Sequence, residues 1–359
     1  MFGLKLGAIC AAGPAMGLLA PTLFGIAADG LDIRVGLLQI ACGGALFAFA
    51  SLAVAMGFGV PLGFGGLLFA ALAIALFRTP MSLMADVLAL ERAPRTGTTY
   101  GRFRLWGSVG FLTATLLAGL WVDPRGALVF PIVCSSALAL GFVSSLALPR
   151  HAELPDRGDG EGLARLLRDG PLRMLLVATF LGQCGHVAYD MGFSIYLFDL
   201  GVPRGWVGVA WALGTGSEVL LMAWSAPVFR RFADPSLLAF GLAAGAARWV
   251  LLTVVRSPGL ILLLQPLHAL SFGLVWLAAV SYTARRYPSR SLATAQGLFV
   301  TAVGTGSITG MLLWGPVYQR GGGSFMFAGA ACFSACAAVV AVALDRKTRA
   351  EKAAYGTTT

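Results

Sequence analysis

Six ionisable side chains interrupt stretches of sequence that are otherwise long and apolar. They are Arg78, Asp86, Asp190, Glu218, Arg248 and His268. An ionisable group at membrane depth costs several kcal/mol unless it has a partner or faces water. These groups could pair with one another and lock helices together. Alternatively, they could line a polar cavity in which carboxylates take up protons and guanidinium groups hold a solute. Their number, and their spread over five apolar stretches, favour the cavity.

Further polar residues accompany one of these groups at helical spacing. Gln265 and Ser271 lie three residues before and after His268, so all three project from one face of a helix. Arg78 and Asp86 are about two turns apart and also project from similar faces. A polar stripe in an apolar helix indicates a cavity.

Membrane-spanning helices must carry these residues. The chain has 359 residues, of which 58% are hydrophobic and 12% are charged, whereas about 25% are charged in soluble domains. The apolar residues form blocks of about 20, the length that a helix needs to cross a bilayer core of about 30 Å. Continuous apolar blocks favour helices over barrel strands, which would alternate. We therefore predict an all-α membrane protein with eleven spans, at 4–25, 35–57, 63–89, 103–121, 127–148, 172–198, 206–228, 237–255, 259–283, 292–315 and 324–344.

The longest polar stretch divides the predicted spans into two groups. It covers residues 149–171 and separates a five-span bundle, 1–148, from a six-span bundle, 172–345, which a tail at 346–359 follows. Within the linker, Leu163–Arg168 is predicted to form a short amphipathic helix at the membrane interface.

The net charge of +10 has a topological explanation. Most of the 26 lysines and arginines fall in one set of alternate loops, which includes the linker and the C-terminal tail. By the positive-inside rule, we expect a multi-pass inner-membrane protein with a cytoplasmic C-terminus. An odd number of spans then puts the N-terminus outside. The basic charge therefore reflects topology, and we expect the lipid bilayer as a partner and no nucleic acid.

No pattern of catalytic or metal-binding residues is evident. All six cysteines fall inside apolar blocks without C-x-x-C spacing, which indicates buried thiols and no metal site. We find no phosphate-binding loop for ATP and no Ser-His-Asp order. We expect no enzyme activity and no cofactor, so transport driven by an ion gradient remains.

Three short motifs in the same order resemble a known family. They are YGRFRLWGS at Tyr100–Ser108, QPLHALSFG at Gln265–Gly273 and AQG at Ala295–Gly297. They resemble parts of the fifth, tenth and eleventh helices in the phenylpropionate-permease-like branch of the major facilitator superfamily. Lactose permease and its kin are more distant relatives. The resemblance covers residues 4–345 and implies a monomer with two pseudo-symmetric helical bundles.

A fourth motif resembles the cytoplasmic gating loop that follows the second helix of that superfamily. Gly25 and Asp29 match its first positions and Arg34 keeps a basic position, whereas Asp32 and Ile33 replace its later glycine and basic residue. Here the motif follows the first predicted span. We therefore expect either a further span encoded upstream or a truncated protein.

The resemblance also implies a solute site. It assigns solute binding to Asp86, Arg104, Phe111, Tyr189, Gln265, His268 and Gln296. Asp86 and Arg104 match the acid and the arginine that bind sugar in lactose permease. A carboxylate accepts hydrogen bonds from hydroxyl groups, and a guanidinium donates them in fixed geometry. Phe111 matches a sugar-stacking tryptophan and keeps an apolar face.

Proton coupling is implied for a second group of residues. Glu218, Arg248 and His268 match the coupling network of lactose permease. Glu218 would link solute to proton, Arg248 would stabilise the ionised form of a nearby acid, and His268 would relay hydrogen bonds. Ser271 replaces the carboxylate that carries the proton there, so Glu218 and Asp190 are the remaining candidates.

We therefore expect a proton-coupled symporter of a small organic solute, of the aromatic acid, sugar or nucleoside class, that works by alternating access. One alternative is an exporter of amphipathic compounds, for which a wide apolar cavity with one unpaired acid would be typical. Another is a non-transporting, truncated membrane protein. The costly internal charges count against both alternatives.

Overall fold

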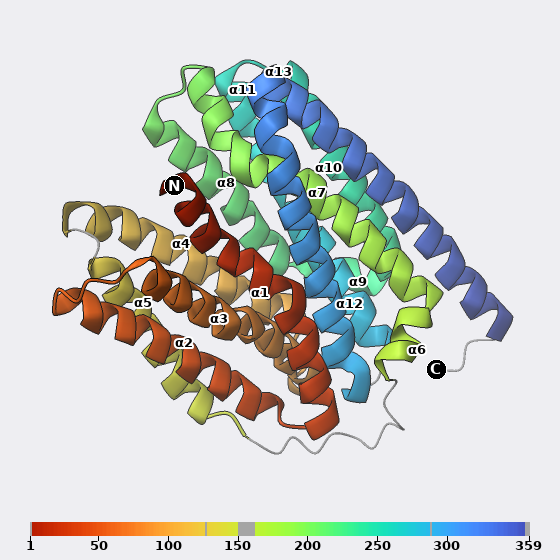
Figure 1. The fold of residues 1–359 in the computed structure, drawn as a ribbon. Helices are drawn as coiled ribbons and strands as arrows, with labels where there is room; N and C mark the ends of the chain where they lie inside the picture. Colours follow the sequence, from red (N-terminus) through yellow and green to blue (C-terminus); the bar gives the residue numbers. More distant parts are fainter. Residues whose placement is uncertain (1, 126–127, 150–161, 288, 356–359) are drawn as a thin grey trace. The chain divides into compact units, whose positions relative to one another are not determined.

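The structure, a computed structural model, is built from α-helices (Figure 1). It describes residues 2–125, 128–149, 162–287 and 289–355, and no β-strand occurs in these ranges. The elements are α1 (Phe2–Leu31), α2 (Arg34–Gly57), α3 (Phe64–Arg92), the 3-10 turn η1 (Pro94–Thr96), α4 (Tyr100–Arg125), α5 (Val129–Leu146), α6 (Leu163–Arg168), α7 (Gly170–Asp199), α8 (Arg204–Ala223), α9 (Ser225–Arg231), α10 (Asp234–Val254), α11 (Pro258–Leu263), the 3-10 turn η2 (Gln265–Leu267), the π-helix η3 (Ala269–Leu274), α12 (Val275–Arg286) and α13 (Ser289–Tyr355).

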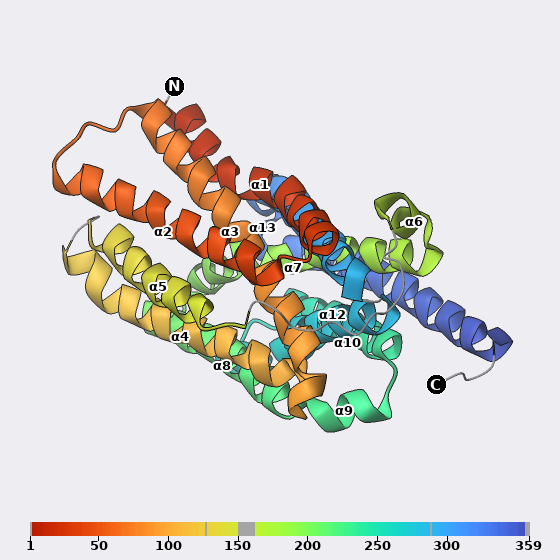
Figure 2. The ribbon, with the colours of Figure 1, turned by 90° about the horizontal axis from the view of Figure 1, so that it is seen from below.

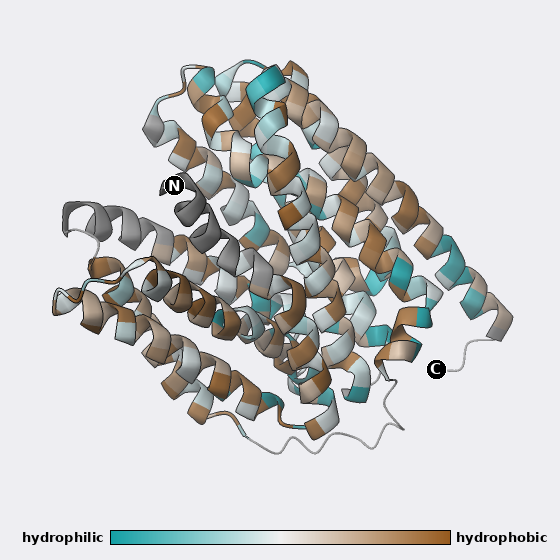
Figure 3. Ribbon diagram, in the orientation of Figure 1, coloured by the Kyte–Doolittle hydropathy of each residue, from teal (hydrophilic) through white to brown (hydrophobic). Residues whose placement is uncertain are grey.

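The helices have the length and the surface of membrane spans. Seven helical stretches of the described residues are long and apolar enough to cross a bilayer, and α2, α3, α5 and α10 are among them. Large apolar side chains are exposed, such as Phe47 at 75% and Leu312 at 74%, as expected for residues that face lipid. Figure 3 shows hydrophobic residues along much of α3 and along the second half of α13.

The first helix is longer than predicted. The sequence suggested an end at residue 25, but α1 continues to Leu31, so Gly25 and Asp29 lie in its last turns and not in a loop. Tertiary contacts explain the extension. Gly25 packs against the backbone of Ala293 in α13, where an added Cβ would lie 2.9 Å from the carbonyl carbon, and Asp29 accepts hydrogen bonds from the same segment.

Only two residues connect α1 to α2. Asp32 has a φ of 51°, in the left-handed region where glycine is usual, and Ile33 follows it. Aspartate tolerates this conformation better than most residues do. Its carboxylate also accepts a hydrogen bond from Arg34 Nη1 at 2.7 Å, which fixes the turn.

The last two predicted spans, 292–315 and 324–344, both lie within α13. The break between them is Gly322, with φ 70° and ψ −176°, a conformation open essentially only to glycine. The second half of α13 extends beyond the predicted end. Its last turns carry an ion pair between Asp345 and Arg349, one turn apart, at 2.9 Å.

The chain divides into two compact units. Unit 1 comprises Met1–Arg95, Gly110–Leu163 and Tyr287–Thr301. Within it, α3 packs against α1 and α2, and α2 also packs against α5. Gly44 in α2 lies directly against the ring of Phe77 in α3, so this position leaves no room for a side chain.

Unit 2 comprises Thr96–Val109, Ala164–Arg286 and Ala302–Thr359. Its core is an aromatic-rich cluster that includes Trp249 and Trp314, at 1% and 2% exposure. Figure 2 shows α10 and α12 side by side in this unit, where they pack against each other. The helices α4 and α13 each contribute to both units, so the predicted division into 1–148 and 172–345 stays a prediction.

The predicted linker helix is confirmed as α6, which spans Leu163–Arg168. Its Leu166 is fully buried. Asp169 follows α6 and caps α7, because its carboxylate accepts from the backbone N–H of Leu172 at 3.4 Å. Arg286, at the end of α12, donates two hydrogen bonds of 2.9 Å to the same carboxylate.

Candidate functional site

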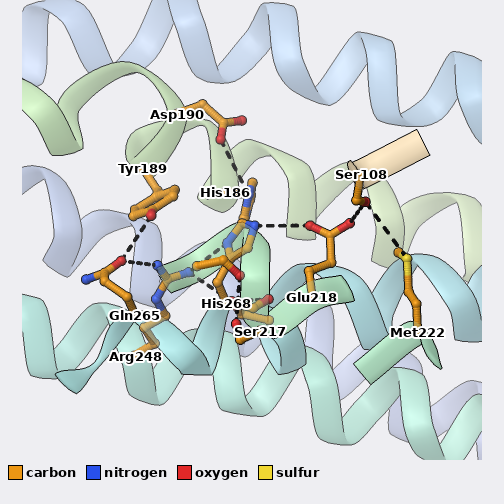
Figure 4. A network of polar contacts seen from close by, with 12 residues as sticks. Ser108, His186, Tyr189, Asp190, Ser217, Glu218, Met222, Arg248, Gln265 and His268 are labelled. Carbon is orange, nitrogen blue, oxygen red and sulfur yellow. Dashed lines mark hydrogen bonds and ion pairs between the residues drawn. The ribbon is translucent and has the colours of Figure 1, made fainter. Parts of the chain in front are cut away.

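A chain of buried polar side chains crosses the interior of unit 2 (Figure 4). Glu218 of α8 has its Oε2 3.5 Å from Nε2 of His268. Nδ1 of His268 lies 3.2 Å from Nη1 of Arg248 in α10. The three residues are 4%, 7% and 0% exposed. The structure therefore brings together the acid, the imidazole and the guanidinium that the sequence assigned to proton coupling.

Irregular backbone positions His268 in this chain. It lies between the 3-10 turn η2, which contains Pro266, and the π-helix η3. Proline has no N–H and interrupts the helical ladder, and single π-turns inside helices frequently occur at functional sites. Gly273 of η3 lets this segment approach α8, because a Cβ there would lie 3.0 Å from Cγ of Glu218.

Arg248 is held by dipoles and aromatic rings. It donates to Oε1 of Gln265 at 3.0 Å and to Oγ of Ser271 at 3.1 Å. Its guanidinium carbon lies 4.2 Å from the ring centroid of Tyr189 and 4.8 Å from that of Trp249, which favours a desolvated cation. Among the described residues, no carboxylate lies within ion-pair distance of Arg248.

The contact with Arg248 determines how His268 carries its proton. A guanidinium only donates hydrogen bonds, so Nδ1 of His268 must accept. A neutral imidazole then bears its proton on Nε2, which points at Oε2 of Glu218. A second proton on Nδ1 of His268 would face the N–H of Arg248, so that two donors would point at each other. The Nε2–H of His268 is therefore directed at the carboxylate of Glu218.

Glu218 has a second donor, Ser108, which the sequence reasoning did not single out. Ser108 Oγ donates to Oε1 of Glu218 at 2.8 Å and is 5% exposed. It lies in the first turns of α4, which belong to unit 2. The residue is part of the YGRFRLWGS motif, but a serine in an apolar helix resembles any small packing residue. Which residue Ser108 bonds depends on how α4 packs against α8, and the local sequence does not show this.

Asp190 also has a partner that the sequence reasoning missed. His186 lies one turn earlier in α7, and its Nε2 is 3.5 Å from Oδ1 of Asp190. The imidazole of His186 is 5% exposed, whereas the side chain of Asp190 is 44% exposed. The spacing of four residues was a usable signal, because such pairs share a helix face.

Tyr189 and Gln265 form a buried support for Arg248. The Tyr189 hydroxyl donates to Oε1 of Gln265 at 3.0 Å, and the Gln265 amide donates to the carbonyl of Ile261 at 2.7 Å. Both side chains are fully buried. Their predicted role in solute binding stays a prediction, and the structure gives them polar partners in the protein.

The other predicted solute residues are divided between the units. Asp86, at 8% exposure, and Gln296, at 1%, belong to unit 1, as does Phe111, which is 61% exposed. Arg104 belongs to unit 2, where its guanidinium carbon lies 5.8 Å from the ring centroid of Trp276.

A second polar cluster lies in unit 1, at the predicted gating motif. Asp29 accepts from the backbone N–H and the hydroxyl of Thr294, both at 2.6 Å, and from the N–H of Ala293 at 3.2 Å. Arg34 Nη2 lies 3.0 Å from Asp29, and Arg34 Nε lies 3.3 Å from Glu91. Asp29 therefore ties the end of α1 to the beginning of α2 and of α13. The sequence reasoning did not name Glu91 or Thr294.

Sequence comparisons agree with this architecture. The family model described as "MFS_1 like family" matches residues 4–328. The chain is 31% identical over 309 residues to the maltose permease of Geobacillus stearothermophilus, covering 85% of this chain and 76% of the relative. It is also 31% identical over 250 residues to the probable 3-phenylpropionic acid transporter of Escherichia coli K12, covering 68% and 65% of the two chains.

Solved structures share the fold. A variant of the E. coli fucose:proton symporter FucP matches with a TM-score of 0.75 at 13% identity, covering 95% of this chain and 91% of that one. A variant of the nucleoside transporter NupG matches with a TM-score of 0.67 at 15% identity, covering 95% and 90%. At such low identity, these matches concern the fold alone.

Proposed function

Because this chain belongs to the MFS_1 like family of major facilitator transporters, which are not enzymes, we propose that it is a proton-coupled symporter of a small organic solute that works by alternating access. The observation that carries the proposal is the buried contact between Glu218 and His268, with Arg248 bound to the far side of the imidazole.

Protonation of Glu218 would change contacts between several helices. The ionised carboxylate accepts from Ser108 of α4 and faces His268, which follows η2. A protonated carboxyl group has one oxygen that donates, so it loses part of this acceptor capacity. The contacts that Glu218 of α8 makes with Ser108 of α4 and with His268 then weaken. Proton uptake thereby shifts the equilibrium between two arrangements of the helices, as coupling requires.

For the solute, we propose the class of aromatic acids ahead of sugars and nucleosides. Arg104 lies beside the Trp276 ring, and its buried Nε has no hydrogen-bond partner among the described residues. An N–H donor next to an aromatic face suits a solute with a carboxylate and a ring. The remaining proposed solute residues are Asp86, Phe111, Tyr189, Gln265, His268 and Gln296.

We further propose that the linker and the C-terminal tail face the cytoplasm of an inner membrane and that the protein acts as a monomer. The cluster of Gly25, Asp29 and Arg34 then gates the cytoplasmic side. The ion pair of Arg34 and Asp29 at 3.0 Å supports the gate, because both side chains are buried and their separation would be costly.

Transport by the full-length chain in proteoliposomes tests the proposal. The substrates are radiolabelled 3-phenylpropionate, maltose and a nucleoside, each with an inward acid gradient and with the gradient collapsed by a protonophore. We expect gradient-driven accumulation of the aromatic acid. Because undissociated aromatic acids also cross lipid, protein-free vesicles under the same gradient provide the baseline. Glu218→Gln should abolish accumulation above this baseline while leaving solute exchange across the membrane, because the solute site remains.

A matched Glu→Gln variant checks the specificity of this effect. Glu351 lies in the last turns of α13 and pairs with Arg286 at 3.0 Å, so Glu351→Gln should accumulate solute as the native chain does. Accumulation by Glu218→Gln at the native level would refute the assigned role of Glu218. Outward movement of amphipathic dyes would favour an exporter, and absence of any transport would favour a non-transporting protein.

A further inference from the structure

His186 is a buried histidine with one free nitrogen. Its Nε2 faces Oδ1 of Asp190 at 3.5 Å, and its Nδ1 is buried without a hydrogen-bond partner among the described residues. A neutral imidazole that bears its proton on Nε2, the nitrogen nearer the carboxylate, keeps a lone pair on Nδ1. This lone pair is a position where a proton can bind.

Aromatic rings surround His186. Phe272 of η3 stacks on it with a centroid separation of 4.9 Å and an interplanar angle of 27°. Tyr189 lies at 5.9 Å and Trp249 at 5.8 Å. The face of an aromatic ring attracts a cation, most strongly where water is excluded.

Three charged or titratable groups besides Tyr189 surround this imidazole. Asp190 lies on the same helix, His268 lies 5.4 Å away between ring centroids, and Arg248 extends from α10 to bind His268. The charge of Arg248 opposes a second cation nearby, so Asp190 must compensate for it. Glu218 lies beyond His268.

The two neighbouring imidazoles differ in one respect. Arg248 occupies Nδ1 of His268, which prevents a second proton there, whereas Nδ1 of His186 has no donor against it. Of these two histidines, His186 alone can become an imidazolium without two hydrogen-bond donors pointing at each other. The two histidines therefore have different roles despite their contact.

We propose that His186 and Asp190 form a second proton-binding site, adjacent to Glu218 and His268, which loads a proton during transport. A solvent proton adds to the Nδ1 lone pair, no bond breaks, and the resulting imidazolium pairs with the Asp190 carboxylate through Nε2–H. The half-exposed carboxylate is the end of the site at which protons enter and leave. The role in transport rests on the proposed proton coupling, whereas proton binding itself does not.

Isotope labelling tests proton binding directly. The chain has three histidines, so His151→Gln in full-length protein leaves only His186 and His268. With 15N-labelled histidine in nanodiscs, the nitrogen shifts distinguish each tautomer from the imidazolium. On acidification we expect one imidazolium, lost in His186→Gln, while His268 keeps its proton on Nε2. Asp190→Asn should weaken proton binding at His186 at least about tenfold, because the opposite charge is removed.

Asp199→Asn is the matched control. Asp199 lies in the same helix and accepts from Tyr318, so this variant should leave the His186 signal unchanged. A His186 that stays neutral at every pH, or that titrates unchanged in Asp190→Asn, overturns the proposal. In proteoliposomes, His186→Gln should lower the proton-to-solute ratio with solute binding retained.

These measurements distinguish a failure of the second proton-binding site from a failure of proton-coupled transport. An unchanged ratio in His186→Gln, beside lost accumulation in Glu218→Gln, would reject the second site's role and leave proton-coupled transport standing. An imidazolium at His186 in a protein whose transport ignores the gradient would reject the coupling and leave proton binding standing.

Discussion

Arg248 donates a hydrogen bond to Nδ1 of His268 over 3.2 Å, inside a part of unit 2 where both side chains are buried. This contact has two consequences. It keeps the imidazole neutral with its proton toward Glu218, and it leaves the guanidinium without a direct carboxylate among the described residues. The cation is held in place by acceptors and aromatic rings, so its geometry matters as much as its charge.

Arg248→Lys should therefore disable the protein although the charge is kept. A lysine ammonium cannot reproduce the planar fork that reaches Gln265, Ser271 and His268 together. Each buried acceptor left unsatisfied costs about 1–3 kcal/mol. We expect a lower thermal unfolding midpoint in detergent and at least about a tenfold loss of transport, since 1.4 kcal/mol corresponds to tenfold.

Arg256→Lys is the matched substitution. Arg256 is exposed and contacts Tyr196 at 3.2 Å, and exposed substitutions usually change stability by less than about 0.5 kcal/mol. Equal effects of the two variants would show that the fork at Arg248 has no special role.

Gly273→Ala should displace Glu218. The new Cβ would lie 3.0 Å from Cγ of Glu218 and 3.3 Å from Cδ2 of Leu221, which is tighter than normal packing. We expect the contact between Glu218 and His268 to lengthen and gradient-driven uptake to fall. Gly216→Ala in α8 meets no atom within 4 Å and should be neutral or stabilising by up to about 1 kcal/mol. Uptake and unfolding midpoints of both variants check this, and unimpaired uptake in Gly273→Ala would contradict it.

Thr294→Val should weaken the attachment of α1 to α13. The substitution keeps the shape and the backbone N–H but removes the hydroxyl that donates to Asp29 at 2.6 Å. Hydrogen bonds to charged groups contribute about 1.5–3 kcal/mol, so we expect a measurable drop in the unfolding midpoint. Thr294→Ser retains the hydroxyl and should lose less. The reverse order of the two midpoints would contradict the assigned bond.

Gly322→Ala should destabilise the turn within α13. Its φ of 70° and ψ of −176° lie in a region that costs other residues about 1–3 kcal/mol. Gly141→Ala in α5, where an added Cβ meets no atom within 4 Å, should be stabilising, because alanine favours helix over glycine. Thermal unfolding of both variants is the measurement, and equal midpoints would argue against the strained turn.

The sequence alone predicted the helices, their membrane character and several members of the buried network. Hydropathy and helical spacing are local properties, so the linker helix Leu163–Arg168 was predicted with its observed bounds. Glu218, Arg248 and His268 stood out because a charge in an apolar span is rare and costly.

The tertiary structure alone decided which of these groups meet. The pairing of Ser108 with Glu218 joins residues 110 positions apart, and the extension of α1 through Asp29 depends on backbone groups of α13. No local pattern encodes such contacts, because they depend on how distant helices pack. His186 shows the same limit. Its spacing from Asp190 was visible in the sequence, but the free Nδ1 and the stacked ring of Phe272 exist only once α7 and η3 lie together.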